Sequence, residues 1–420
     1  MSAWNFDLPQ SDREILRKLA ERVRTIADST RMEELRTLWT RHNRLDPQRP
    51  MVLIETGGVR AELPYLNERD CQSDFGRGIE GYLRFQLYQA ETIKDDAVIE
   101  PYFPTGWVIS MSDYGVSMEQ HRSDGGEDGF GSYVWDPPLS NLGEDFGKLR
   151  KRTFSVDRGA TQANNETVDS VIGDILPVKM RGVPWWTMGM TMTAIHLVGL
   201  QNLMLYMYDD PEGLHRLMNF LMEDHMALLD WMEAEDLVNL NNRSDYIGSG
   251  SQGHSDEIGY PEPEHPKIAD LWGLSESQET VGVSPELFDE FVFKYQQPVI
   301  ERFGLCYYGC CEPVHTRWHV IKRIQNLRKV SISPWCDEER IAAEMGSDYV
   351  YCRKPNPTLI STDNFDETAI REDLRKTLAI CRENKCPLEF AMKDVHTVKR
   401  KPGRLARWVE LAREEIDAGS

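Results

Sequence analysis

The sequence has few cysteines for its length and no long apolar run, and each scarcity excludes a class of protein. Eight cysteines in 420 residues are too few for a small disulfide-bonded secreted scaffold, and only Cys71 lies in the first 300 residues. No uninterrupted apolar run approaches the roughly 18 residues that a membrane-spanning helix needs. The opening MSAWNFDLPQSDREI lacks the basic start and apolar centre of a signal peptide. We therefore expect a cytoplasmic protein with free thiols.

Basic residues are also scarce relative to acidic ones. The chain has 48 Lys and Arg against 69 Asp and Glu, which gives a formal net charge of -21. Such a surface repels phosphate groups, so nucleic acids and anionic membranes are not expected partners. Apolar residues still make up 40% of the chain, which is enough for a folded core. The balance suits a soluble enzyme, or one that docks a basic patch on another protein.

The spacing of apolar residues divides the chain into two parts. Residues 1–48 carry apolar side chains at three- and four-residue intervals, which predicts an N-terminal helical extension. Residues 49–420 form the main domain, which begins with a buried strand at 51–55. A segment rich in Gly, Pro, Trp and Asp, about 103–158, interrupts this domain. It predicts a long Gly-rich insertion of the kind that covers an active site.

Strand and helix patterns alternate at least five times after the insertion. The predicted strands are 183–190, 237–242, 305–311, 329–334, 349–354 and 387–393, with helices between them. Such alternation predicts parallel βα units in an α/β fold. An open doubly wound sheet and a closed (β/α)8 barrel both fit this pattern. Because no glycine-rich phosphate-binding signature follows the first strand, we predict the (β/α)8 TIM barrel.

Polar residues follow one predicted strand after another. In a parallel barrel these residues meet at a single mouth, where active sites of this fold lie. The candidates are Asn241 and Tyr246; Glu276, Gln278 and Glu279; Cys310, Cys311 and Glu312; Trp335; Asn356; and Lys393, Asp394 and His396.

The segment YGCCEPVH, residues 308–315, carries the most specific chemistry. Adjacent thiols such as Cys310 and Cys311 form a strained disulfide, but they can present thiolates to a soft cation. Two thiolates with the imidazole of His396 make a three-ligand zinc site with one open position. The alternative is that both cysteines are small buried residues. Glu276 and Glu279 suit general acid/base work or recognition of a substrate hydroxyl, or else an acidic first turn of a helix.

Over residues 170–415 the sequence resembles the uroporphyrinogen decarboxylase superfamily. The resemblance rests on YDDPEGLHRLMNFL, LNNRSDYIGSGSQG, WGLSESQETVGVSPELFDEFVFKYQQPVIERFG, YYGCCEPVHTRWHVIKRI and MKDVHTVKRKP. That superfamily contains the decarboxylase and zinc-dependent methyltransferases that exchange methyl groups with a corrinoid protein. The resemblance implies a (β/α)8 barrel with its site at the carboxyl ends of the strands.

Within the superfamily the sequence is more similar to the methyltransferases. The first strand region, MVLIETGGVRAELPYL, lacks the paired arginines of the decarboxylase. The methyltransferases bind zinc through a His-x-Cys-Gly turn and a further cysteine after the last strand. Cys310 matches the first cysteine, whereas Tyr308 stands in place of the histidine, and Asp394 and His396 stand where the last cysteine would be. The YGCCEP turn and the MKDxHT ending resemble one branch of the superfamily.

The resemblance implies a methyltransferase that moves a methyl group from a small O- or N-methylated substrate to a corrinoid protein. Zinc on Cys310, Cys311 and His396, with Glu312 as an alternative ligand, would act as Lewis acid. Four residues are candidate catalytic groups: Lys393, Asp394, Glu279 and Glu312. Substrate-binding candidates are Asn241, Tyr246, Glu276, Gln278, Trp335 and Asn356. The insertion at 122–140 would serve as a lid or a docking surface.

Two alternatives remain open. A metal-free decarboxylase or lyase would use Lys393, Asp394 and Glu279 for proton transfer. A non-catalytic barrel would hold a corrinoid or small ligand without turnover. Relatives commonly dimerise, so the resemblance also implies a homodimer.

Overall fold

A six-stranded parallel sheet forms the centre of the protein, which is described by a computed structural model over residues 7–122 and 133–419. The strands lie in the order β1-β12-β11-β10-β9-β8, and all are short and almost wholly buried. Apolar side chains on both faces are typical of parallel strands covered by helices. The strands are β1 (Met51–Ile54), β8 (Trp272–Ser275), β9 (Leu305–Tyr308), β10 (Leu327–Ile332), β11 (Val350–Arg353) and β12 (Leu388–Met392).

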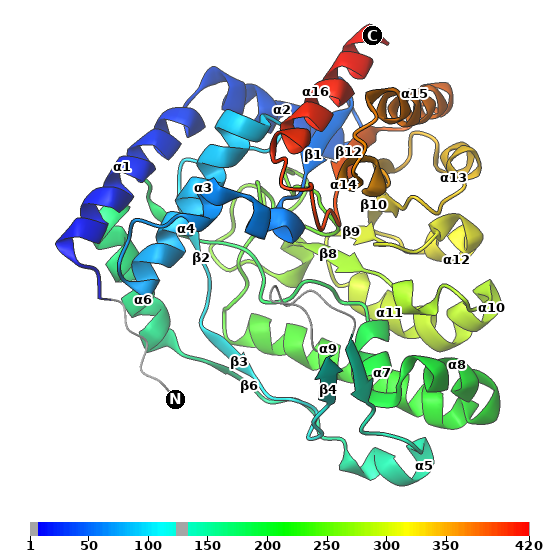
Figure 1. Ribbon diagram of the computed structural model, residues 1–420. Coiled ribbons are helices and arrows are strands. Elements are labelled where there is room, and N and C mark those ends of the chain that lie inside the picture. Colours follow the sequence, from blue (N-terminus) through cyan, green and yellow to red (C-terminus); the bar gives the residue numbers. More distant parts are fainter. Residues whose placement is uncertain (1–6, 123–132, 420) are drawn as a thin grey trace.

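Helices follow each of these strands and lie outside the sheet (Figure 1). Side-chain caps fix where several of them begin: Asp337 accepts from the Arg340 amide, and Asp366 accepts from the Thr368 and Ala369 amides. The helices are α10 (Pro285–Phe288), α11 (Lys294–Ile300), α12 (Trp318–Ile321), α13 (Glu338–Met345), α14 (Thr358–Ser361), α15 (Glu367–Asn384) and α16 (Gly403–Ala418). The predicted strand–helix order from residue 305 onwards is confirmed.

The predicted α/β fold with parallel strands is confirmed, but closure of the predicted barrel is not shown, because the ladder stops at β1 and β8 in the described residues. Side chains take over its hydrogen bonds on the remaining side. Asp95 and Asp96 accept from the Ile54 and Val52 amides of β1, and the Asn241 amide group exchanges two hydrogen bonds with the Trp272 backbone of β8. Between them lies the parallel pair β2 (Phe103–Thr105) and β7 (Val178–Met180).

Two predicted strands are therefore wrong. Residues 183–190 contain Pro184, which has no amide hydrogen for a ladder, and they make one backbone bond to the sheet, from the Met188 amide to Leu274. Residues 237–242 meet β8 through the Asn241 side chain instead of a backbone ladder. Between these two segments lie three helices, α7 (Thr191–Val198) and α8 (Leu200–Asp209), which Gly199 separates, and α9 (Pro211–Ala234).

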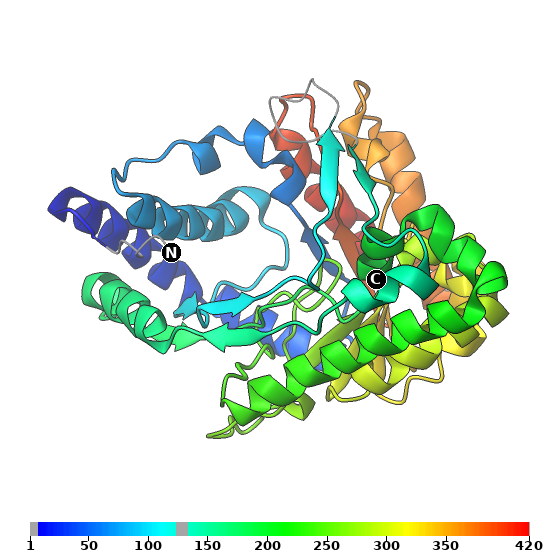
Figure 2. The ribbon, with the colours of Figure 1, turned by 90° about the horizontal axis from the view of Figure 1, so that it is seen from below.

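The N-terminal helices contribute to the core on one face of β1. Met51 and Leu53 join a core with Leu16, while Val52 and Ile54 face the core of the main sheet. This alternation follows from the two-residue period of a strand. Helix α1 lies against α4 and α6 at one end of the molecule (Figure 2). The helices here are α1 (Gln10–Ala27), α2 (Thr30–Asn43), α3 (Pro64–Asn67), α4 (Asp74–Tyr88) and α6 (Arg158–Ile172). The domain boundary at 48/49 stays a prediction.

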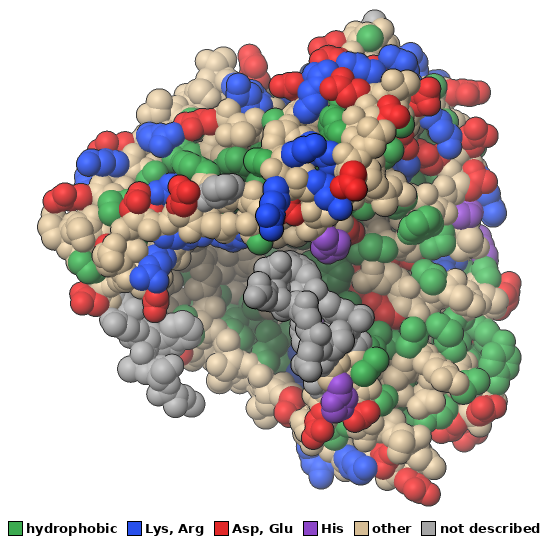
Figure 3. Space-filling view, viewed as in Figure 1, with side chains coloured by type: hydrophobic (Ala, Val, Ile, Leu, Met, Phe, Trp, Pro, Cys, Tyr) green, Lys and Arg blue, Asp and Glu red, His purple; other side chains and the backbone are tan. Residues whose placement is uncertain are grey.

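The insertion contains two antiparallel strand pairs and the short helix α5 (Leu142–Asp145). Its strands are β3 (Ile109–Met111) with β6 (Phe154–Val156), and β4 (Glu119–Arg122) with β5 (Tyr133–Asp136). Part of the predicted lid, residues 123–132, lies outside the described residues. The face seen in Figure 1 is hollowed below the N-terminal helices (Figure 3). Within the described ranges, no helix has the length and apolar character needed to cross a membrane.

Candidate functional site

Two cysteine sulfurs lie just beyond the carboxyl end of β9, where the sequence predicts the mouth. Cys310 is 4% exposed, and its Sγ lies 3.6 Å from Sγ of the exposed Cys311. Ser249 Oγ donates to Cys310 Sγ at 3.5 Å, and Cys311 Sγ lies 3.7 Å from Asp394 Oδ2. The hydrogen bond from Cys311, with Lys393 and Ser249, lowers the pKa of Cys310 to about 7 against the effect of burial. The same bond raises the pKa of Cys311. Cys310 is therefore the thiol of the pair that ionises more readily.

Lys393 supplies the positive charge beside this thiolate. Its Nζ lies 2.8 Å from Ser249 Oγ, 3.6 Å from Cys310 Sγ and 3.7 Å from Asp394 Oδ1, and the residue is 7% exposed. Burial lowers the pKa of Lys393, but the negative charges of Cys310 and Asp394 outweigh it and raise the pKa above its ordinary value. The ammonium and the thiolate thus form a buried ion pair at the ends of β9 and β12.

Two buried carboxyl groups lie next to the thiolate. Glu312 accepts from the Cys310 amide at 2.8 Å and the Ser277 amide at 2.9 Å, and burial raises its pKa. Glu276 is fully buried, and its Oε1 has no hydrogen-bond partner among the described residues. Burial and the charges of Glu279 and Glu312 raise the pKa of Glu276 well above its ordinary value. The raised pKa favours the protonated form of Glu276, which is the form that a general acid needs.

A cavity of about 580 Å³ opens beside the Cys311 side chain. Gln278, Glu279 and Trp335, which the sequence predicts as site residues, line it together with Cys311. Glu279 accepts from Thr191 Oγ1 at 2.6 Å, which fixes the carboxylate at the start of α7. The structure thus brings residues from the ends of three strands to one opening next to the thiolate.

A second cavity, of about 540 Å³, lies on the other side of the loop at 249–251. Tyr246 lines it, is 50% exposed, and donates its hydroxyl to Glu55 Oε1 at 2.7 Å. Gly250 has a φ of 91°, and an added Cβ there would lie 3.0 Å from Glu55 Oε1. Only glycine lets the loop pass this close to Glu55 in that conformation.

Three other predicted residues lie elsewhere or have their polar atoms engaged. Asn241 uses both ends of its amide on the Trp272 backbone, as described above, so it serves the scaffold. Asn356 Oδ1 accepts from Thr358 at the start of α14. His396 packs against the loop after β1, since a Cβ added at Gly58 would lie 3.3 Å from its Nδ1. Their roles in substrate or metal binding stay predictions.

The arrangement around Cys310 does not fit the predicted zinc site. The Lys393 ammonium lies 3.6 Å from Cys310 Sγ, so a divalent cation bound to this sulfur would lie against a buried like charge. In the described part of the chain, Cys310, Cys311 and His396 are not among the groups of three ligand atoms within 4.8 Å of one another. Both observations disfavour zinc there, and the ligand set of the prediction is not assembled.

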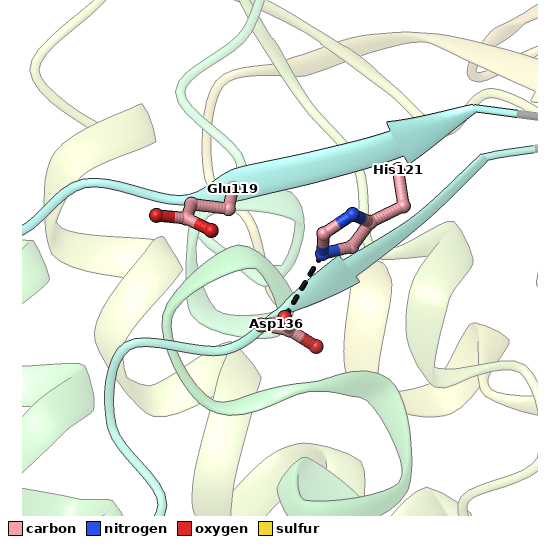
Figure 4. A group of neighbouring side chains, drawn as sticks. All are labelled: Glu119, His121 and Asp136. Carbon is pink, nitrogen blue, oxygen red and sulfur yellow. Dashed lines mark hydrogen bonds and ion pairs between the residues drawn. The ribbon is translucent and has the colours of Figure 1, made fainter.

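A different group of side chains could hold a metal ion. Glu119, His121 and Asp136 lie on the hairpin of β4 and β5, with all three ligand atoms within 4.8 Å (Figure 4). His121 Nε2 lies 2.9 Å from Asp136 Oδ2, and all three side chains are exposed. Exposed acidic groups of this kind are common without a metal.

The sequence analysis missed three residues of the site. Glu55 directly follows the first strand and would have been found by the rule applied to the later strands. Ser249 lies on a glycine-rich loop without a preceding strand, so no pattern marked it. Arg317 is buried beside Glu312 and donates to Thr280 Oγ1 at 3.1 Å, which needs the three-dimensional arrangement to see.

The comparisons with known proteins do not identify a family for this chain. No family model matches the sequence, and no curated protein matches it. Among solved structures, the chain is similar to a methyltransferase from Methanosarcina mazei, with 12% identity over 91% of this chain and 98% of that one, at a TM-score of 0.47. A likeness of that size identifies neither a family nor an activity.

Proposed function

We propose that the chain is a methyltransferase that takes a methyl group from a small O- or N-methylated substrate and passes it to a corrinoid protein. One observation carries the proposal: the buried thiol of Cys310, whose pKa is lowered, and the buried carboxyl group of Glu276, whose pKa is raised, lie at the carboxyl ends of two neighbouring parallel strands. Methyl transfer from an ether needs a proton for the leaving oxygen and a site that tolerates positive charge on the moving carbon. This pair of groups supplies both.

The steps follow from the charges of the site. The bond between the methyl carbon and the substrate oxygen breaks, and its electron pair stays on the oxygen. Glu276 gives that oxygen a proton and becomes a carboxylate. Cys310, kept anionic by Lys393, stabilises the positive charge that builds on the methyl carbon as it moves to the acceptor. Glu279, Gln278 and Trp335 bind the rest of the substrate in the cavity they line.

The proposed acceptor is a cobalt(I) corrinoid presented by another protein. The apolar side chains Trp335 and Val281 are 66% and 52% exposed at the edge of the Cys311 cavity. They make this cavity the place where a partner would approach. Zinc takes no part in the proposal, because the Lys393 ammonium lies beside the sulfur atom that would bind it.

The test uses cob(I)alamin as a surrogate acceptor and follows formation of methylcobalamin by absorbance with a panel of methyl ethers and methylated amines. We expect turnover with at least one donor, and a loss of about 100-fold or more for ethers in Glu276→Gln. Cys310→Ser should also lose activity, whereas the matched control Cys71→Ser, whose thiol is buried away from the sheet ends, should not. Absence of methylcobalamin with every donor and with reduced corrinoid protein would refute the proposal.

A second candidate, a decarboxylase or lyase, is favoured by one observation. Lys393 and Asp394 form an ion pair 3.7 Å apart at the mouth, and an ammonium there can bind a substrate carboxylate. In this reaction the bond between the carboxylate and the substrate carbon breaks and CO₂ leaves. The electron pair of that bond stays on the substrate carbon, which takes a proton from Glu276. Release of CO₂ from a carboxylic acid without any methyl acceptor distinguishes it from methyl transfer. Tight binding of a corrinoid with neither reaction would instead indicate the binding role.

A further inference from the structure

The cavity of about 540 Å³ behind the loop at 249–251 is separate from the one at Cys311 and has a distinct chemistry. Its lining is mainly apolar and includes the aromatic residues Tyr82, Phe85, Tyr102 and Tyr246. It lies between the end of β1, helix α4 and the segment 95–104. A mostly apolar cavity with a few polar groups is the usual form of a small-molecule site.

Three carboxyl groups and a buried amide oxygen line this cavity, from Glu55, Asp95, Asp245 and Gln89. Glu55 Oε1 accepts from Tyr246, and in the described residues no cation lies within 4.0 Å of this carboxylate. Gln89 is 5% exposed and lines the cavity, and its buried Oε1 has no partner among the described residues. Asp95 also lines it and accepts from Gln89 Nε2. A ligand that satisfies these groups must bring donors or positive charge.

Positive charge is scarce around the cavity. Arg60 is the cation among the lining residues of the described chain, and it is exposed. Asp245 lines the cavity too, but it forms an ion pair with Arg181 and is already neutralised. Among the described residues, the carboxylates of the cavity wall without an ion pair within 4.0 Å are therefore Glu55, next to the Tyr246 ring, and Asp95, and Lys393 acts on Glu55 only from beyond that distance.

We propose that this cavity binds a small organic cation, an ammonium nitrogen carrying methyl groups, with the cation held between Glu55 and the aromatic rings. Carboxylate and aromatic faces together are the chemistry that recognises methylated ammonium groups. A neutral molecule of the same shape fills the apolar space but leaves the Glu55 charge without a partner. An anion is repelled by it.

The cation lies next to the thiolate site but on the other side of one short loop. Gly250 and Ser251 line the cavity, while the adjoining Ser249 contacts Cys310 and Lys393. The inference does not depend on methyl transfer, because it concerns binding alone.

The test measures binding of choline and of its uncharged isostere 3,3-dimethylbutan-1-ol by calorimetry. We expect choline to bind about tenfold or more tightly than the isostere. Glu55→Gln should weaken choline binding by a similar factor and leave the isostere unchanged, and Glu55→Asp should restore part of it. Glu212→Gln, which changes an exposed carboxylate at the start of α9, is the matched control. Thermal melting checks that each variant is folded.

Two outcomes overturn the inference: equal affinity for the two probes, or tighter binding of the anionic 3,3-dimethylbutyrate. Failure of the proposed function is separate. Choline binding without methylcobalamin formation leaves this inference standing and refutes the methyltransferase. Demethylation of ethers by a protein that does not bind choline supports the methyltransferase and refutes the cation site.

Discussion

Replacing Lys393 by Met should raise the pKa of the Cys310 thiol to its ordinary value or above. The two groups lie 3.6 Å apart and are buried, so little solvent screens them. At such a separation unit charges attract by about 4 kcal/mol in surroundings with an effective dielectric constant of about 20. One pKa unit corresponds to about 1.4 kcal/mol. Removal of the ammonium is therefore large enough to cancel the whole lowering of the pKa from 9.0 to about 7.

The assay is a pH titration of thiolate absorbance in the ultraviolet, which does not require a reagent to reach the buried sulfur. Subtracting the titration of Cys310→Ser isolates this thiol. At neutral pH about half of Cys310 should be thiolate in the parent and about 1% in Lys393→Met. Lys393→Arg should keep most of the thiolate.

The control is Lys399→Met, which removes an exposed lysine from the same loop and should leave the titration unchanged. An unaltered Cys310 titration in Lys393→Met would refute the ion pair. The hydrogen bonds from Cys311 and Ser249 would then be the whole cause of the low pKa.

Three further predictions concern charge and metal. The Glu276 carboxyl group has a pKa near 4.5 in the unfolded chain and well above that in the folded protein. Between these values the folded state binds more protons than the unfolded state, so the parent loses stability as the pH rises. In urea unfolding, Glu276→Gln should be more stable than the parent by about 1 kcal/mol or more at pH 8, and the difference should be smaller at pH 5. Glu389→Gln leaves the fully buried Lys329 ammonium without its partner at 2.7 Å and should cost about 3–5 kcal/mol, against less than about 1 kcal/mol for the exposed Glu410→Gln, by the same measurement. Elemental analysis of protein purified without chelator should find no stoichiometric zinc at Cys310 and His396. Stoichiometric zinc that is lost in both Cys310→Ala and His396→Ala would contradict the conclusion that the surroundings of Cys310 do not fit zinc.

The late part of the fold was predictable because its segments are locally consistent. Residues 305–418 alternate short apolar strands with amphipathic helices that carry side-chain caps such as Asp337 and Asp366. The region before β8 was not predictable in the same way. There Asp95, Asp96 and Asn241 hydrogen-bond to strand backbones, and a side chain that replaces a ladder leaves no two-residue pattern in the sequence.

The contacts within the candidate site were also not predictable from the sequence. The rule that functional residues follow parallel strands placed Cys310, Glu276 and Lys393 at one mouth. The charge that lies next to a given atom depends on the direction of each side chain, and this rule does not predict side-chain direction. His396 lies only three residues from Lys393, yet it is the lysine that reaches Cys310 Sγ. A neutral imidazole in that place can share a metal ion with the sulfur, whereas an ammonium pairs with the sulfur as a thiolate. The lysine beside Cys310 Sγ therefore favours a thiolate over the zinc ligand that the sequence predicts.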